Sequence, residues 1–233
     1  NEDKDLVAQD YKQIKLPERI CLRWYYQNFY MQLPPDSLLQ FQLQRWSRYL
    51  TIIMIFISLL VLLGWQFSIE LLKDPFSTTV AMNPVSAIGF ILSGISLWLF
   101  KNYAYRKIAY ILATVILLVG LLKFGGLAFG LDLPIDTFLF TNKLLEAQAA
   151  NLPNRMAPNT AFCFVLTGVS LLLFSHENAK KQKPSHYIAL VIVLMGMLSL
   201  LGYLYRVKSF YGFLTYIPMA ASTAVCFFLF AIS

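Results

Sequence analysis

Few side chains in this 233-residue sequence have the types and spacing that catalysis or metal binding requires. His176 and His186 flank a lysine cluster in a charged loop, which predicts solvated side chains rather than paired haem ligands. Cys21, Cys163 and Cys226 show no C-x-x-C spacing, and no zinc, Walker or serine-hydrolase motif occurs. We therefore expect no catalytic residue, metal or cofactor in this chain.

Lys123 is the one ionisable residue clearly within an apolar run. Such residues are costly at depth in a membrane and count as functional candidates. Three interpretations are open. The ammonium group snorkels to the outer interface, it pairs with an external carboxylate, or it belongs to a proton or ion pathway. The candidate carboxylates are those of Glu70, Asp132 and Asp136.

A short phrase recurs at the start of three apolar runs. It reads Met82-Asn83-Pro84-Val85-Ser86-Ala87, then Met156-Ala157-Pro158-Asn159-Thr160-Ala161, and finally Met219-Ala220-Ala221-Ser222-Thr223-Ala224. The match continues in register through Phe90, Phe164 and Phe227, Leu92, Leu166 and Leu229, Gly94, Gly168 and Ala231, and Ser96, Ser170 and Ser233. So many shared positions in register indicate an internal repeat.

One interpretation of the phrase is a signal for starting and packing a helix. Proline suits the first helical position, where its missing N–H has no partner to lose. A hydroxyl one turn later can bond local backbone carbonyls, and small residues further on let membrane helices approach closely. On this interpretation the phrase has no ligand.

The other interpretation is a ligand pocket near the outer face, surrounded by the three methionines. Aromatic side chains of the outer loops then help to line it for a small apolar or amphipathic ligand; otherwise they are ordinary interface anchors. The candidate ligand-binding residues are Met82, Met156, Met219, Ser86, Thr160, Thr223, Phe140, Tyr211, Tyr216 and Lys123.

The elements that position these residues are apolar runs. The chain is 58% hydrophobic and 13% charged, whereas soluble domains carry about 25% charged residues. A span needs roughly 20 apolar residues, and five complete runs and one incomplete run approach this length, at 50–67, 84–100, 108–129, 158–174, 187–205 and 220–233. These runs lack the alternation of barrel strands. They predict an all-α membrane protein with six transmembrane helices.

Each copy of the repeat pairs two successive runs. The copies cover about 50–100, 108–174 and 187–233, and each crosses the membrane twice, so all three have the same orientation. Parallel repeats are related by an axis along the membrane normal. We expect three tandem hairpins around a pseudo-threefold axis. The middle outer loop is longer, and its residues 141–150 are expected to form a short helix, either a lid or an interfacial helix.

The net charge of +7 is concentrated in short loops rather than in a nucleic-acid-binding patch. Clustered Lys and Arg usually mark the cytoplasmic side of a membrane protein. Both chain termini are therefore expected in the cytoplasm. The clustered cations are Arg45, Arg48, Lys101, Arg106, Lys107, Lys180, Lys181 and Lys183.

The two ends of the chain suggest further parts. Residues 1–48 form an expected cytosolic and interfacial segment, with an amphipathic helix at 36–49 that precedes the membrane module of residues 49–233. The third copy of the repeat ends about one helical turn earlier than the other two. We expect the polypeptide to continue into a cytosolic output domain.

The phrases "RMAPNTAFCFVLTGVSLLLF" and "LLGYLYRVKSFYGFLTYIPMAASTAVCFFLF" resemble the N-terminal membrane region of bacterial sensor proteins. In that group a six-helix module precedes PAS, histidine kinase or diguanylate cyclase domains. The resemblance covers about residues 50–233 and departs from the pattern at Ala221, where the third copy lacks the proline. It implies a sensory role, without identifying the stimulus or the output enzyme.

The first functional hypothesis is a transmembrane sensory input module of a two-component or nucleotide-cyclase receptor in the bacterial inner membrane. Its sixth helix passes a signal to a cytosolic effector in the same polypeptide, and homodimerisation is expected by analogy with related receptors. The alternatives are a scaffold or assembly subunit that binds a partner through residues 1–48, and a small transporter or channel. A membrane enzyme is the remaining possibility.

Overall fold

The structure is a computed structural model that describes residues 35–74, 80–131, 139–141, 144, 155–175, 183–205 and 219–233. The described part is 84% helical and contains no strand, which confirms the all-α fold class. The chain divides into two units, residues 1–45 and 46–233. The helices that matter for function belong to the second unit.

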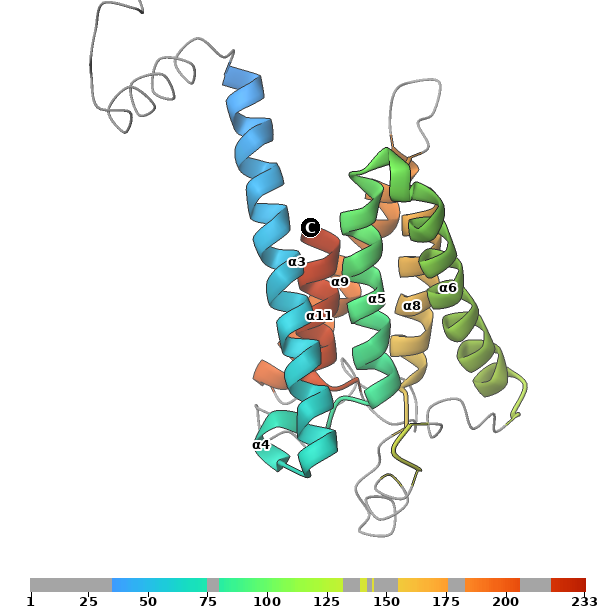
Figure 1. Cartoon of the computed structure of the whole chain (residues 1–233). Helices are drawn as coiled ribbons and strands as arrows, with labels where there is room; N and C mark the ends of the chain where they lie inside the picture. Colours follow the sequence, from blue (N-terminus) through green and yellow to red (C-terminus); the bar gives the residue numbers. More distant parts are fainter. Residues whose placement is uncertain are drawn as a thin grey trace, which may run out of the picture. The chain divides into compact units, whose positions relative to one another are not determined.

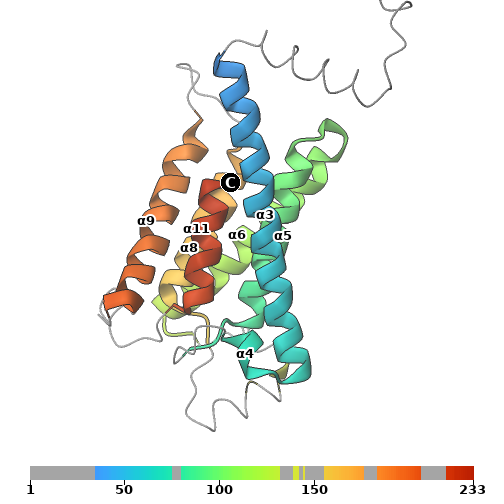
Figure 2. The same ribbon diagram turned by 90° about the vertical axis from the view of Figure 1, so that its left-hand side faces the viewer.

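In the described part of the chain, each of the six predicted apolar runs lies largely within a helix, and all of these helices except α3 match their runs within a few residues (Figure 1). Their directions alternate along the chain (Figure 2). A four-residue helix and a 3-10 turn lie in the connections. In chain order the elements are α3 (Pro35–Phe67), α4 (Glu70–Lys73), α5 (Pro84–Phe100), η1 (Tyr103–Tyr105), α6 (Arg106–Ala128), α8 (Pro158–Leu172), α9 (Pro184–Tyr205) and α11 (Ala221–Ile232).

The long helices differ in their capacity to cross a membrane. Three stretches are long and apolar enough to span one, namely 42–67 in α3, 103–128 across η1 and α6, and 184–205 in α9. These give the chain the character of a membrane protein. The helices that begin at the repeated phrase are shorter, with 17 residues in α5, 15 in α8 and 12 in α11. At about 1.5 Å per residue α11 rises roughly 18 Å, less than a bilayer core.

The first span departs from its prediction. The amphipathic helix expected at 36–49 is not a separate element, because α3 runs unbroken from Pro35 to Phe67. Its sequence has no glycine or proline between Pro35 and Gly64 that would stop or kink it. The expected boundary at residue 49 is therefore the interior of one 33-residue helix.

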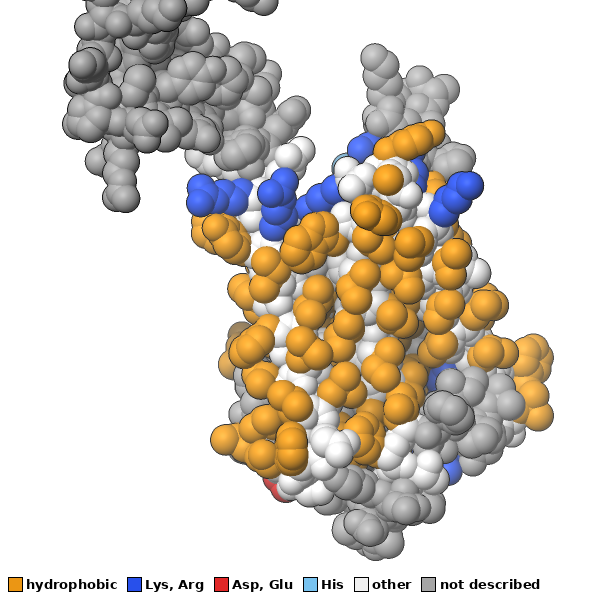
Figure 3. Space-filling view, in the orientation of Figure 1, with side chains coloured by type: hydrophobic (Ala, Val, Ile, Leu, Met, Phe, Trp, Pro, Cys, Tyr) orange, Lys and Arg blue, Asp and Glu red, His pale blue; other side chains and the backbone are white. Residues whose placement is uncertain are grey.

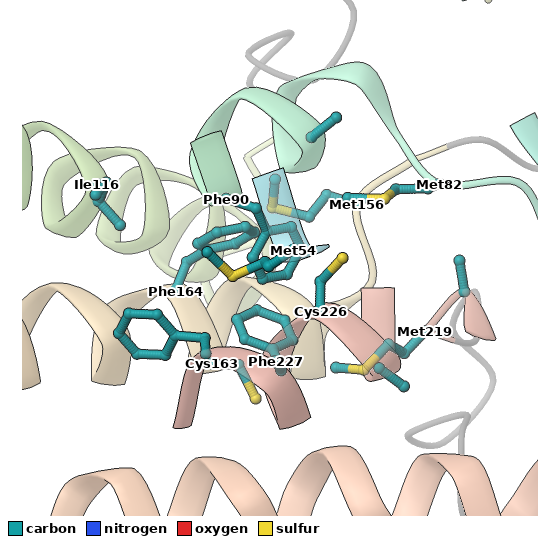
Figure 4. Packing of buried hydrophobic residues seen from close by; sticks show 14 of the residues in the cluster. Met54, Met82, Phe90, Ile116, Met156, Cys163, Phe164, Met219, Cys226 and Phe227 are labelled. Atoms are coloured by element: carbon teal, nitrogen blue, oxygen red, sulfur yellow. The ribbon is translucent and has the colours of Figure 1, made fainter. Parts of the chain in front are cut away.

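The core of the second unit centres on three aromatic rings, one from each short helix (Figure 4). Phe90 of α5, Phe164 of α8 and Phe227 of α11 are at most 2% exposed. Their ring centroids lie 5.1 Å apart for Phe90–Phe164, 4.6 Å for Phe90–Phe227 and 5.0 Å for Phe164–Phe227. We call these three residues the phenylalanine triad. Its tilted and edge-on ring pairs are favourable aromatic geometries.

Glycines set how closely the helices approach. A Cβ on Gly168 of α8 would lie 2.7 Å from the Leu117 Cα of α6, so these two helices meet backbone to backbone. A Cβ on Gly94 of α5 would meet only side-chain atoms of α3, such as Ile55 Cδ1 at 2.7 Å. Close backbone contact through small residues is a usual device of membrane helices. Here it holds α6 to α8 more tightly than α3 to α5.

The outer surface of the second unit is apolar, and charge gathers at one end of it (Figure 3). Large hydrophobic side chains such as Ile111 and Leu194 are more than half exposed, as lipid-facing residues are. Lys101, Arg106 and Lys107 lie where α5 ends and α6 begins, and Lys183 precedes α9. The starts of α5, α8 and α11 lie at the opposite end.

Candidate functional site

A small polar pocket lies where the starts of α5, α8 and α11 converge. Its volume is about 10 Å³, enough for one water-sized particle. Each of the three helices contributes its first turn or the extended residues before it. We call it the outer pocket; its lining residues are Val80, Ala81, Asn83, Ser86, Arg155, Met156, Ala157, Thr160, Ala220 and Thr223.

Three hydroxyl-bearing residues, one from each helix, contribute to the lining of this pocket. Ser86, Thr160 and Thr223 are 1%, 3% and 2% exposed, respectively. Each is the third residue of its helix, so the side chains reach the same level.

The backbone enters the three helices in the same way. The residues before the first turn, Asn83, Ala157 and Ala220, all have extended conformations, with φ/ψ of −66°/138°, −65°/149° and −60°/145°. Only Asn83 caps its helix, since its side chain accepts a hydrogen bond from the Val85 N–H. The alanines offer no cap. In the first turn of α8 the Thr160 N–H instead donates to the Asn159 side-chain oxygen at 3.0 Å.

The electrostatics of the outer pocket are positive. Each helix start carries about half a positive charge from the aligned peptide dipoles. Arg155 is the only charged residue in the described lining, and no carboxylate contributes to that lining. The arrangement can therefore donate hydrogen bonds from hydroxyl and backbone groups into a site of positive potential.

The methionines take different places from the predicted ring. Met156 lines the outer pocket, but Met82 and Met219 do not. Both are fully buried in the core, and their backbone carbonyls accept hydrogen bonds from Trp65 Nε1 at 2.9 Å and from Tyr203 Oη at 2.6 Å. Their shared position in the phrase serves to anchor the backbone before α5 and α11.

The remaining candidate residues lie apart from the pocket or outside the described residues. Phe140, with a left-handed φ of 57°, packs against the core. Lys123 is buried, at 3% exposure. Glu70, one of its proposed partners, instead contacts Lys73. Tyr211, Tyr216, Asp132, Asp136 and most of the predicted helix at 141–150 lie outside the described residues, although Leu144 is buried.

Sequence analysis missed two members of the pocket that its own motif contains. Asn83 follows the first methionine, and Arg155 directly precedes the second. The signal was present, because a polar residue before a helix-starting proline is a typical N-cap. Arg155 has no counterpart in the other two copies, so the repeat pattern alone did not select it.

A second, shallow groove of about 50 Å³ lies at the opposite end, between α3 and the end of α5. Arg48, Trp98 and Lys101 contribute to its lining. Partial burial lowers the pKa of the Lys101 ammonium group, and the nearby Arg48 charge lowers it further. Two like charges near one groove place positive potential at this end as well.

The fold and the pocket define a protein of membrane character that is helical throughout its described part, with a small polar pocket between helix starts. Comparison takes the identification no further, since no family model, curated protein or solved structure matches the chain. In the described residues, no group of three metal-ligating side chains occurs either. The function must be argued from the geometry.

Proposed function

We propose that this chain is the transmembrane sensory input module of a bacterial signalling protein, with six helices arranged as three hairpins around a pseudo-threefold axis. The outer pocket receives a signal, and α11 passes it to a cytosolic effector in the same polypeptide. The module acts in the inner membrane as a homodimer, with both termini in the cytoplasm. The gathering of Lys and Arg at the end opposite the pocket supports this orientation.

Matching contacts in different hairpins support the repeat. Ser96 Oγ donates to the Ala109 carbonyl at 3.0 Å, and its equivalent Ser170 donates to the Ser185 carbonyl at 3.2 Å. Each bond joins a short helix to the first turns of the next long helix. The aromatic donors to the Met82 and Met219 carbonyls also match, since each follows a glycine near the end of a long helix.

The observation that carries the sensory function is the position of the phenylalanine triad directly behind the outer pocket. Phe90 stands four residues after Ser86, and the other two rings follow Thr160 and Thr223 at the same distance, so each ring shares a helix face with a hydroxyl. The rings are buried and in mutual contact. A polar pocket with packed, buried rings one turn deeper on the same three helices suits the reception of a signal better than the conduction of a solute.

Transmission needs two arrangements of the helices. A ligand shifts the equilibrium between these arrangements only if it binds them with different affinities. The three helices whose starts line the pocket also carry the phenylalanine triad, so a change in their separation at the pocket requires the rings to repack. Packed rings have discrete arrangements. The far end of α11 would then move relative to α6.

The test measures the distance between α6 and α11, at their ends opposite the outer pocket, in variants whose outer pocket is altered. Spin labels at Ile108→Cys and Ile232→Cys, both about half exposed, report the α6–α11 separation in lipid nanodiscs, with Cys21→Ser removing the undescribed cysteine. Thr160→Leu and, separately, Ser86→Val fill the outer pocket. We expect either variant to shift the distance distribution, whereas Thr114→Leu, on the lipid-facing side of α6, does not.

Two results would overturn the sensory function. One is an Ile108–Ile232 distance that neither pocket variant moves, although both variants retain the helical content of the parent chain. The other is flux of protons, potassium or chloride through liposomes that contain the purified protein, since this would make the chain a channel or transporter.

A further inference from the structure

We propose that the groove between α3 and the end of α5 binds the headgroup of an anionic phospholipid. In the bound state the lipid phosphate lies between the side chains of Arg48 and Lys101, beside the Trp98 ring, and an acyl chain follows α3 into the membrane. This inference rests on the membrane character of the chain. It is independent of the proposed sensory function, because the groove lies at the end opposite the outer pocket.

The first argument is the pair of cations that line the groove. Arg48 belongs to α3 and Lys101 directly follows α5, and both side chains are exposed. Partial burial lowers the pKa of the Lys101 ammonium group, and the Arg48 charge lowers it further, so the two cations repel each other. The described lining holds no carboxylate to offset this repulsion. A phosphate between the two cations replaces the repulsion by attraction, and an arginine can bind two phosphate oxygens at once.

The second argument is the depth of the groove relative to a membrane. Trp98 lines the groove and is well exposed, as are Trp46 and Tyr49 near the same end of the membrane-spanning part of α3. Exposed Trp and Tyr side chains are enriched at the membrane–water interface. Lys and Arg side chains gather at this end, next to the apolar outer surface (Figure 3). The groove therefore opens at the level where lipid headgroups lie.

The third argument is an apolar stripe that continues from the groove along α3. Ile52 lines the groove, and Phe56, Leu59 and Leu63 follow it at spacings of four, three and four residues. These spacings place all four side chains on one face of the helix, and they are 45–59% exposed. Arg48 shares this face, one turn before Ile52. A cation followed by an apolar stripe matches an anionic headgroup with a hydrocarbon chain, whereas a free phosphate ion would use the cation alone.

The shape of the groove restricts what enters it. Thr51 and Leu97, which are buried, form its floor. The Thr51 hydroxyl already donates to the Ser47 carbonyl at 2.9 Å, so the two cations are the donors that remain for a phosphate. The volume of about 50 Å³ is several times the space that one water needs. A phosphate group enters it, while the rest of the headgroup stays outside.

The experiment adds lipids to the whole purified chain in an uncharged detergent and records the midpoint of thermal unfolding. Binding to the folded state alone raises this midpoint in a saturable way. Dioleoyl phosphatidylglycerol is compared with dioleoyl phosphatidylcholine, which has the same chains but no net charge, and with glycerol phosphate, which has no chains. We expect a saturable rise with phosphatidylglycerol alone.

Variants localise the effect to the groove. Arg48→Gln and Lys101→Gln remove one cation each, and the loss of a hydrogen bond to a charged group should raise the phosphatidylglycerol concentration at half of the effect by about tenfold. Lys107→Gln is the matched control, because it removes the same charge from an exposed side chain at the same end, outside the groove lining. It should titrate like the parent chain. Lys101 also lies at the negative end of α5, so its replacement lowers the midpoint without lipid as well. The concentration at half of the effect is therefore the measure.

Several outcomes would refute the lipid site. A midpoint that no lipid changes, or that both phospholipids raise equally, would show that the headgroup is not recognised. Equal titrations of Arg48→Gln, Lys101→Gln and Lys107→Gln would assign the effect to the general charge of this end. A saturable rise with glycerol phosphate would make the groove a site for soluble anions. None of these outcomes bears on the Ile108–Ile232 distance, so the sensory function stands or falls separately.

Discussion

Trp65 and Tyr203 perform the same task with different chemistry. Each lies one residue after a glycine near the end of a long helix, and each donates a hydrogen bond to the carbonyl of a methionine that precedes a short helix. The bond fixes where the extended segment ends and the helix begins. The middle copy has Leu127 at this place, which cannot donate.

Removing one of these donors should destabilise the protein. In Tyr203→Phe the ring remains but the Met219 carbonyl, in a residue that is fully buried, loses its 2.6 Å hydrogen bond. We expect a loss of about 1 kcal/mol in the free energy of unfolding. Thermal or denaturant unfolding in detergent measures it. Tyr105→Phe, at a half-exposed tyrosine of η1, is the control and should be neutral; an equal loss in both would contradict this role.

At the residue scale, Ser86, Thr160 and Thr223 of the predicted ligand-binding set line the outer pocket, whereas Met82 and Met219 are buried outside its lining. Ser86, Thr160 and Thr223 were recognisable because they lie inside helices, where periodicity fixes the face that a side chain occupies. Met82 and Met219 precede the helices, and no periodicity governs an extended segment. Their burial depends on tertiary bonds to Trp65 and Tyr203 that no local pattern contains.

Glycines bring α6 and α8 into close backbone contact. Besides Gly168, Gly120 of α6 would bring a Cβ within 2.7 Å of the Val165 amide nitrogen of α8. The contact is thus reciprocal, with a glycine on each helix. Gly125, one turn and a half further along α6, has open space around it.

Substitution of these glycines tests the contact. Gly168→Ala places a methyl group within 2.7 Å of backbone atoms of α6, which cannot move aside without separating the helices. Overpacking of this kind costs about 1–3 kcal/mol. The melting temperature in detergent should fall accordingly. Gly125→Ala, the matched control, should leave it unchanged or raise it through better helix propensity; the opposite ranking would refute the assigned packing.

At the element scale the sequence predicted the helices well and their lengths less well. Apolar runs marked all six helices, because hydropathy responds to composition over many residues. The runs did not reveal that α8 ends at Leu172, nor that α3 continues through residue 49. Helix ends depend on local capping and packing, which a run of apolar residues does not specify.

The distribution of charge belongs to the whole molecule. Lys101, Arg106, Lys107 and Lys183 share one end of the second unit with Arg48, whereas the outer pocket opens at the other. The sequence predicted this polarity from loop composition. It could not predict that three helix starts would meet, since convergence depends on long-range packing of α5, α8 and α11.

Cysteine labelling in intact cells tests the orientation. Lys107→Cys and Leu131→Cys place reactive thiols at exposed positions on opposite ends of α6, in a Cys21→Ser background; Cys163 and Cys226 are buried. A membrane-impermeant maleimide applied from outside should modify the residue-131 thiol alone. Both thiols should react after the membrane is permeabilised. Labelling at residue 107 in intact cells would reverse the assigned orientation.

The serine bonds between neighbouring hairpins have a mechanical consequence. Ser96 ties α5 to α6 and Ser170 ties α8 to α9, but the equivalent Ser233 turns back to the Leu229 carbonyl of its own helix. Between α11 and α3 the described residues have a different bond, from side chain to side chain, between the Ser58 hydroxyl and the Cys226 thiol. At Gly94, α5 meets side-chain atoms of α3 rather than its backbone. The contacts of α3 therefore depend on side chains, which can change rotamer, so a widening of the helix packing would meet least resistance there.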